Sequence, residues 1–280
     1  MPRRPILLLV AASIALAIAA LALFMFHEAR ADPLVRRAEV AVPGLLQPLR
    51  IVLLSDIHIG TAAMDGERLD RIVGQINALH PDIVAIAGDF IFGHDPKGAA
   101  RRGPAMVAPL SHLRPRLGTV AVLGNHDYWT GAPAVRAQLA RAHVTLLEND
   151  AAVFGPLTVG GISDKFTRHD DAAATLRAVR ALGRPSVLLT HAPDIAPRLP
   201  GDVLLLAGHT HCGQAMLFGI RLSPEVSNAG ARYRCGLVRE GDRTVIVTAG
   251  LGTSGVPLRI GAPPDLWLIT LVPVPQRARR

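Results

Sequence analysis

The chain has 280 residues, half of them apolar, so it can build a sizeable core in one large α/β domain or two small ones, and disorder is excluded. Its 30 Lys and Arg residues outnumber its 22 Asp and Glu residues, and the net charge of +8 favours an anionic partner. Because aromatic residues make up only 4% and do not alternate with basic ones, a membrane surface or phosphorylated substrate is favoured, and no nucleic acid partner is expected.

The N-terminal segment, residues 1–30, contains an uncharged apolar run from Ile6 to Phe26. At about 1.5 Å per residue, a helix over this run spans a hydrocarbon core of about 30 Å. The run predicts a single-pass anchor in the inner (cytoplasmic) membrane.

Two other interpretations of this segment stay open. Ala29-Arg30-Ala31 resembles a signal-peptide cleavage site, although the apolar run is longer than in most signal peptides. The pair Arg3-Arg4 also allows a twin-arginine export signal. Basic residues flank both ends of the run, so the side of the membrane on which the rest of the chain lies is left open.

The rest of the chain divides by composition. Residues 31–45 are polar and predict a linker, with an edge strand from Glu39 to Val42. Residues 46–275 predict the folded domain. Residues 276–280 form a basic tail, which either binds anionic lipid or is solvated.

The domain alternates between apolar runs of strand length and segments with helical periodicity. The predicted strands are Arg50 to Leu54, Ile83 to Ala87, Val120 to Leu123, Ser186 to Thr190, Val203 to Ala207, Thr244 to Thr248 and Leu266 to Leu271. The predicted helices are Asp65 to Leu79, Pro104 to Arg114, Ala132 to Ala142 and Asp171 to Leu182. This order predicts a mostly parallel or mixed sheet system covered by helices.

Polar residues follow five of these strands directly, where α/β folds build their sites. The segments are Ser55-Asp56-Ile57-His58, Gly88-Asp89, Gly124-Asn125-His126-Asp127, Thr190-His191 and Gly208-His209-Thr210-His211. Glycines precede Asp89, Asn125 and His209, which suits sharp turns without a Cβ clash.

These segments supply carboxylate, amide and imidazole groups without a thiolate. Such a mixture suits Mn, Fe or Zn rather than Ca or Mg alone. The ligands are too many for one tetrahedral ion, whereas two ions sharing one carboxylate would use them all, and Asp89 is the natural bridge. The predicted metal ligands are Asp56, His58, Asp89, Asn125, His191, His209 and His211.

The order Asp-x-His, Gly-Asp, Gly-Asn-His-Asp, His, Gly-His-x-His resembles the calcineurin-like metallophosphoesterase superfamily over essentially the whole domain. The resemblance implies a four-layer αββα sandwich, preceded here by the transmembrane helix. It also implies that Asp56, His58, Asp89 and His211 hold one metal, and that Asp89, Asn125, His191 and His209 hold the other.

The resemblance further implies two catalytic residues. His126 would not bind metal but would face the substrate phosphate and stabilise or protonate the leaving oxygen. Asp127 would fix the orientation of His126 and favour its charged form. A hydroxide that bridges the two metals would be the nucleophile, since binding to metal lowers the pKa of water to about 7.

The N-terminal apolar segment, together with features in the C-terminal part of the chain, resembles a bacterial membrane-associated phosphodiesterase subgroup. The C-terminal features are the glycine-rich segment from Gly250 to Gly255, Arg259, Gly261-Ala262-Pro263-Pro264 and Cys212-Gly213-Gln214. This resemblance implies hydrolysis of phosphodiester or pyrophosphate bonds in a lipid-linked substrate, of phospholipid or UDP-2,3-diacylglucosamine type. A catalytically weak metal-binding scaffold and a membrane-tethered protein phosphatase are the alternatives.

The remaining polar residues have simpler interpretations. Surface or satisfied core positions are expected for His27, His80, His94, His112, His143 and His169. Cys212 and Cys235 are too few for a disulfide framework, and Cys212 is expected to be a small buried residue in a tight turn, with an oxidation-sensitive thiol as the alternative. Contact with substrate phosphate or lipid is considered for Arg232, Arg234 and Arg259.

Overall fold

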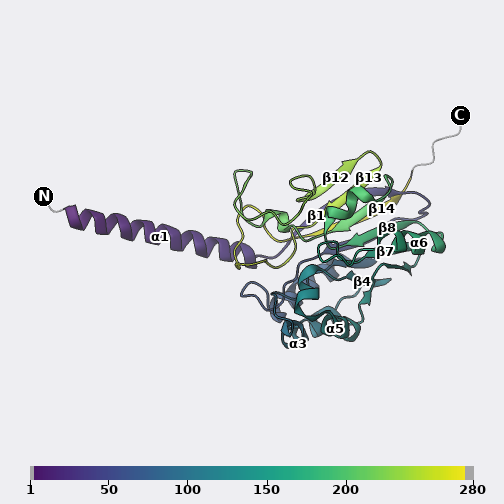
Figure 1. The fold of residues 1–280 in the computed structure, drawn as a ribbon, viewed down its shortest axis with the longest axis horizontal. Coiled ribbons are helices and arrows are strands. Elements are labelled where there is room, and N and C mark those ends of the chain that lie inside the picture. The colour runs from purple at the N-terminus through teal and green to yellow at the C-terminus, as the bar shows by residue number, and fades with distance from the viewer. Residues whose placement is uncertain (1–2, 275–280) are drawn as a thin grey trace.

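The structure is a computed structural model that describes residues 3–274, so the predicted basic tail at 276–280 lies outside the described residues. A long helix, α1 (Arg3–Arg30), leads into an α/β domain (Figure 1). Residues Ile6–Arg30 of α1 are long and apolar enough to cross a membrane, by length and composition. Their side chains are exposed from Ile6 to Phe24, and the last turns of the helix pack on the domain.

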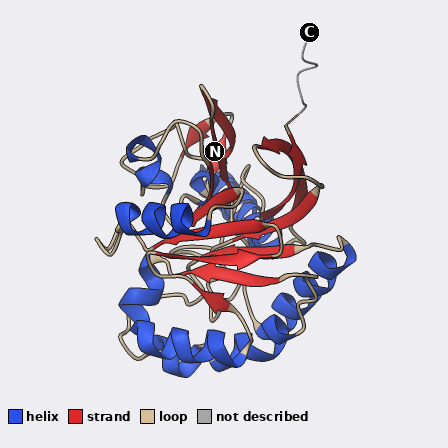
Figure 2. Ribbon diagram, turned by 90° about the vertical axis from the view of Figure 1, so that its right-hand side faces the viewer, coloured by secondary structure: helices blue, strands red, loops and turns tan. Residues whose placement is uncertain are grey.

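Two six-stranded mixed sheets form the centre of the domain (Figure 2). The first sheet has, in spatial order, β1 (Leu34–Val42), β14 (Asp265–Pro273), β2 (Leu49–Leu54), β3 (Ile83–Ala87), β4 (Gly118–Val122) and β5 (Thr145–Leu146), with only the β14–β2 pair antiparallel. The second has β12 (Gly236–Glu240), β13 (Arg243–Val247), β9 (Leu204–Ala207), β8 (Ser186–Thr190), β7 (Leu157–Ile162) and β6 (Asp150–Phe154), parallel in its central strands.

Helices cover the outer face of each sheet. The first sheet carries α2 (Gly66–Ala78), α4 (Pro104–Ser111) and α5 (Asn125–Arg141), with the short α3 (Gly98–Arg102) beside α5, and the second carries α6 (Ala172–Leu182). A two-stranded hairpin, β10 (Met216–Leu217) and β11 (Ile220–Arg221), lies outside both sheets. The predicted four-layer αββα architecture is confirmed.

The strand sequences explain the layering. In β2, Ile51 and Leu53 pack between the two sheets, whereas Val52 and Leu54 pack against the helices of the first sheet. Both faces are therefore buried, which requires the continuous apolar runs that identified the strands. The helix α2 begins after Asp65, whose carboxylate accepts a hydrogen bond from the backbone N–H of Arg68, as expected of a helix cap.

Several elements differ from the sequence prediction. The strand expected from Glu39 begins at Leu34, so most of the expected linker is the edge strand β1. Helix α5 begins at Asn125, earlier than the predicted start at Ala132. The residues before Ala132 form a separate helical segment that a break at Gly131 (φ 113°) divides from the rest. The glycine pair in β7 hid that strand, since glycine usually weakens a strand interior. Here a Cβ on Gly160 would collide with Val179 of α6.

Candidate metal centre

The predicted site residues lie together at the carboxyl ends of parallel strands from both sheets. The residues after β2, β3 and β4 come from the first sheet, and those after β8 and β9 come from the second. All seven predicted ligands are buried, with exposures of 6% or less. Because the two sheets are packed face to face, the five strand ends converge at one edge of the sandwich.

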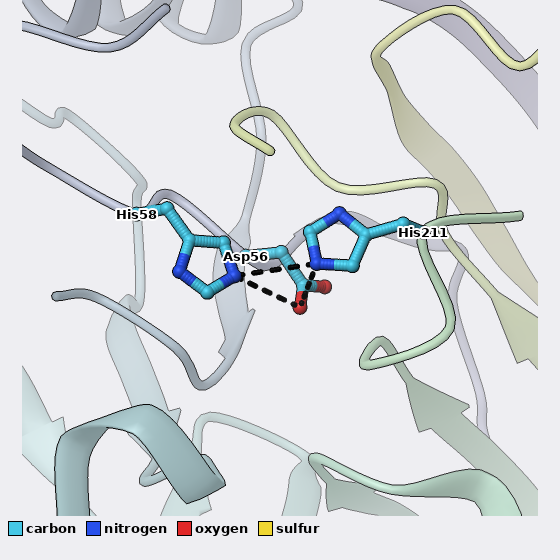
Figure 3. A group of neighbouring side chains, drawn as sticks. All are labelled: Asp56, His58 and His211. Atoms are coloured by element: carbon cyan, nitrogen blue, oxygen red, sulfur yellow. Dashed lines mark hydrogen bonds and ion pairs between the residues drawn. The ribbon is translucent and has the colours of Figure 1, made fainter. Parts of the chain in front are cut away.

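Asp56, His58 and His211 form the first group of ligand atoms (Figure 3). Nε2 of His58 lies 3.2 Å from Nε2 of His211, and Oδ1 of Asp56 lies 3.4 Å from the same His211 atom. Oδ1 of Asp56 has no hydrogen-bond partner among the described residues. Two imidazole nitrogens and one carboxylate oxygen therefore lie close together, and no described N–H or O–H group donates to the carboxylate oxygen. Such an arrangement is typical of a cation site.

Asp89, Asn125, His191 and His209 form a second group. Nε2 of His191 lies 3.3 Å from Oδ2 of Asp89, 3.1 Å from Oδ1 of Asn125 and 3.2 Å from Nδ1 of His209. Oδ2 of Asp89 also lies 3.5 Å from Nε2 of His58 in the first group. One carboxylate oxygen thus faces both groups.

His126 lies beside both groups, and one of its ring nitrogens lies within 4.8 Å of ligand atoms of His58 and Asp89. Its Nδ1 lies 2.9 Å from the carbonyl oxygen of Gly93. That carbonyl, and not a carboxylate, holds the ring.

The expected contact between Asp127 and the His126 ring is wrong. The Asp127 carboxylate instead accepts hydrogen bonds from the backbone N–H groups of Asp89, Phe90, Ile91 and Gly124, at 2.9 to 3.2 Å. The reason is that Asp127 lies in the first turn of α5 and points back under the loop after β3. It fixes the backbone that carries Asp89.

Burial and charge set the protonation of the site. Burial lowers the pKa of His58 to about 3, so its imidazole is neutral at pH 7. Burial alone would raise the pKa of the Asp89 carboxyl, but His191 and His126 hold it well below its usual range. Conversely, Asp89 outweighs the effect of burial on His191 and raises its pKa, so this imidazole holds a proton that a bound cation would displace.

Five of the seven predicted ligands have left-handed backbone conformations. Their φ angles are 50° at Asp56, His58 and His211, 57° at Asp89 and 71° at His209. This conformation is uncommon outside glycine and costs about 1 to 2 kcal/mol per residue. Such outliers cluster at functional sites, where the surrounding structure enforces them.

Close packing requires the glycines of the site. A Cβ on Gly124 would collide with the Asp89 carboxylate, and a Cβ on Gly208 would collide with the side chains of Ser55 and Asp56. Gly88 has a positive φ of 81°, as a sharp turn requires, but Gly124 has an extended backbone. Of the expected turns, those at Gly124 and Gly208 are instead points of close approach.

A cavity of about 200 Å³ opens beside both groups of ligand atoms. Its walls are formed by Asp89, His94, Asn125, His126, Trp129, Phe166, His209, His211, Val226 and Ser254. The ring of His94 stacks on that of Trp129 with centroids 4.6 Å apart, so a histidine assigned from the sequence to a surface or core role forms part of the cavity wall.

Arg259 does not contact the cavity, contrary to the role considered for it. Its side chain is fully buried and donates hydrogen bonds to the carbonyl oxygens of Ala249, Gly252 and Ala262. Its Nη2 also lies 3.3 Å from Nδ1 of His211. Arg259 therefore holds the loop that supports His211.

The two other arginines form ion pairs outside the cavity. Arg232 pairs with Glu240, and Arg234 lies 3.1 Å from Glu225. Neither lines the cavity.

Cys212 and Cys235 form a disulfide, with their Cα atoms 4.7 Å apart. Cys212 is buried in a turn as expected, but the sequence interpretation did not include the bond. The disulfide closes a loop that begins directly after His211.

The chain is similar to several proteins named as metallophosphoesterases. A "Transmembrane protein with metallophosphoesterase domain" from Danio rerio is 34% identical over 276 residues, covering 90% of this chain and 60% of the relative. An "Uncharacterized metallophosphoesterase" from Helicobacter pylori is 29% identical over 257 residues, covering 89% of this chain and 66% of the relative. "Uncharacterized metallophosphoesterase YkuE" from Bacillus subtilis is 29% identical, covering 82% of this chain and 81% of the relative.

This chain spans only 60% to 66% of the length of the first two of these relatives. The calcineurin-like phosphoesterase family matches residues 49–213, more than half of the chain and nearly the whole of the candidate site. The buried Asp and His groups at the strand ends agree with that family's metal dependence. The chain therefore belongs to the calcineurin-like phosphoesterase family.

Proposed function

We propose that the chain hydrolyses a phosphodiester or pyrophosphate bond in a lipid-linked substrate, at a site that holds two divalent ions of Mn, Fe or Zn. The observation that carries this proposal is the position of Asp89, whose Oδ2 faces His58 in one group and His191 in the other. A carboxylate oxygen in this position could bind one ion in each group, so that two ions share Asp89.

The side chains fit two cations. Oδ1 of Asp56, which faces the first group of ligand atoms, is buried without a partner among the described residues, and unpartnered buried polar atoms are costly. In this assignment one ion is held by Asp56, His58, Asp89 and His211, and the other by Asp89, Asn125, His191 and His209. When bound, the ions would lower the pKa of water toward about 7 and neutralise charge on the phosphate.

His126 acts on the leaving group in this proposal. The Gly93 carbonyl holds Nδ1, which leaves Nε2 for the substrate, and the ring lines the cavity. From there the imidazole can donate a hydrogen bond or a proton to the leaving oxygen. Asp127 contributes indirectly, because it holds the backbone of Asp89.

Contacts between α1 and the domain favour a retained anchor over a cleaved signal. The buried Arg68 donates hydrogen bonds to the carbonyl oxygens of Arg30 and Ala31, and the backbone N–H of Arg259 donates to Met25. Cleavage after Ala31 would remove all three contacts. An anchor held this way keeps the site near lipid headgroups, which supports a lipid-linked substrate.

The disulfide supports a position on the oxidising side of the inner membrane. Disulfides persist outside the cytoplasm and are rare within it. A UDP-2,3-diacylglucosamine substrate belongs on the cytoplasmic side, so the Cys212–Cys235 bond favours the phospholipid type.

Hydrolysis of bis-p-nitrophenyl phosphate by the purified full chain, with Mn, Fe or Zn added separately, tests the proposal. We expect metal-dependent turnover of this diester to exceed that of the p-nitrophenyl monoester. Absence of turnover with every metal would contradict the proposal and support the scaffold alternative. A preference for the monoester and for phosphopeptides would support the protein phosphatase instead.

A further inference from the structure

A loop beside the metal centre exposes several large apolar side chains. The loop comprises residues 213–234, closed at its base by the Cys212–Cys235 disulfide, and we refer to it as the hairpin loop because it contains β10 and β11. Phe218 at its tip is 95% exposed, and Ile220 and Leu222 are 66% and 60% exposed. Apolar side chains gathered on one exposed tip usually mark a binding surface.

The tip has an unfavourable residue for its conformation. Phe218 and Gly219 have φ angles of 48° and 80°, the values of a tight hairpin turn that normally selects Asn, Asp or Gly. A bulky aromatic residue at such a position is uncommon. Packing among residues 3–274 does not explain Phe218.

The root of the hairpin loop lies next to the end of α1. The backbone N–H of Arg259 donates to the carbonyl oxygen of Met25 in α1, and the adjoining Ile260 exchanges backbone hydrogen bonds with Gln214 and Met216. One extended segment therefore separates the helix from the hairpin. Figure 1 shows green loop segments at the end of the domain from which α1 leaves.

The exposed part of α1 fixes the level of the membrane surface. Its side chains are exposed from Ile6 to Phe24, and at about 1.5 Å per residue this length spans about 28 Å, close to the thickness of a hydrocarbon core. The domain begins to cover the helix at Met25, to which Arg259 bonds. The hairpin root is thus at the level where the bilayer would begin.

The hairpin loop also reaches the metal centre. Its residue Val226 lines the cavity, as does Ser254, whose backbone N–H donates to the side chain of Gln214. Val256, 61% exposed, continues the apolar surface next to Ser254. The loop that exposes the apolar tip therefore also supplies part of the cavity wall.

The charged residues of the loop do not oppose insertion of its tip. Arg221 and Arg234 both pair with Glu225, at 3.1 Å each, and Arg232 pairs with Glu240. From Met216 to Ile220 the tip carries no charged residue. Uncharged apolar and aromatic side chains are those that settle in the membrane interface.

We propose that the hairpin loop inserts its tip into the bilayer beside α1 and guides the phosphate of a membrane lipid into the metal cavity. The part that concerns catalysis rests on the proposed function. The occupant of this surface is a lipid leaflet, because the surface lies at the level where α1 enters the membrane and only the segment at Arg259 and Ile260 separates it from that helix.

Fluorescence quenching by brominated lipids tests the contact without requiring turnover. The full-chain variants Phe218→Trp and Leu46→Trp are reconstituted in phosphatidylcholine vesicles with and without bromine on the acyl chains, and the wild-type signal of Trp129 and Trp267 is subtracted. Leu46 is the matched control because it is 88% exposed, in the turn at the other end of β1 from α1.

We expect bromine to quench the added fluorescence of Phe218→Trp and to leave that of Leu46→Trp unchanged. Equal, weak quenching of the two variants would overturn the proposal. A blue-shifted but unquenched Phe218→Trp signal would also overturn it, and would indicate that a second copy or another protein covers the tip.

A second measurement tests the guidance of lipid. The double variant Phe218→Asp, Ile220→Asp should cleave phosphatidylglycerol in vesicles about tenfold more slowly than the wild type. Its hydrolysis of soluble bis-p-nitrophenyl phosphate should be unchanged, and Leu46→Asp should alter neither rate. An unchanged rate on vesicle lipid would overturn the guiding role.

The two proposals fail separately. A chain that hydrolyses the soluble diester but shows no quenching contradicts the bilayer contact alone. A chain that is quenched but hydrolyses no diester with any metal contradicts the proposed function alone.

Discussion

Oδ1 of Asp89 accepts a hydrogen bond from the backbone N–H of His126 at 2.9 Å. This bond fixes the carboxylate so that its other oxygen, Oδ2, faces both groups of ligand atoms. The residue proposed to bridge the metals and the residue proposed to serve the leaving group are therefore held by one contact.

Replacing Asp89 should disturb both metal sites. We expect Asp89→Ala to bind each ion more than about 100-fold more weakly. Residues that only support a metal ligand contribute about 10-fold to 100-fold, and Asp89 is proposed to bind both ions directly. Elemental analysis of the dialysed chain measures it. Asp70→Ala, at an exposed carboxylate, is the control and should retain both ions. Two tightly bound ions in Asp89→Ala would argue against a bridging role.

Replacing His126 should separate metal binding from catalysis. His126→Ala should keep two ions and lose about 10²-fold to 10⁴-fold in turnover, the usual contribution of a positioned acid. The loss should be larger for an alkyl phosphodiester than for a p-nitrophenyl diester, because an alkoxide needs a proton more than p-nitrophenolate does. Loss of an ion from this variant would show that His126 is a ligand.

Replacing Arg259 should weaken one ion only. Because its guanidinium contacts His211, which belongs to one of the two groups, Arg259→Met should weaken that ion by about 10-fold to 100-fold and leave the other in place. Titration of the metal-free chain with Zn, followed by calorimetry, would resolve the two sites. Arg232→Met, at an exposed ion pair, is the control and should change neither affinity. Equal weakening of both ions would indicate general destabilisation.

Removing the disulfide should destabilise the domain. The bond joins residues 23 positions apart, and a loop of that size contributes about 3 kcal/mol to the free energy of unfolding. The double variant Cys212→Ser, Cys235→Ser should unfold at a correspondingly lower denaturant concentration. A reductant should lower the stability of the wild type but not of this variant. Free thiols in the wild type alkylated at cell harvest would contradict both the bond and the oxidising compartment.

The candidate site was largely predictable because its residues follow buried strands. Apolar runs such as Ile83 to Ala87 mark strands covered on both faces, and a polar residue directly after such a run, as at Asp89, must lie at the sheet edge. Strands and helices with strong periodicity were therefore placed to within a few residues, except for the start of α5. The strand β7 was missed because its two glycines are explained only by close packing: Gly160 lies against Val179 of α6, and Gly161 lies against Leu147 and Val122.

The sequence by itself determined the sheets covered by helices, the apolar N-terminal helix and which polar residues gather at the strand ends, because these follow from local periodicity. The order of the short motifs gave the resemblance to the family, and that resemblance implied the four-layer αββα arrangement. Only the tertiary structure decided that Asp127 holds backbone N–H groups, that Arg259 supports His211, that Cys212 pairs with Cys235, and that an apolar tip lies beside α1. These relationships join residues far apart in the chain, and their partners are selected by distance and burial after the sheets have packed.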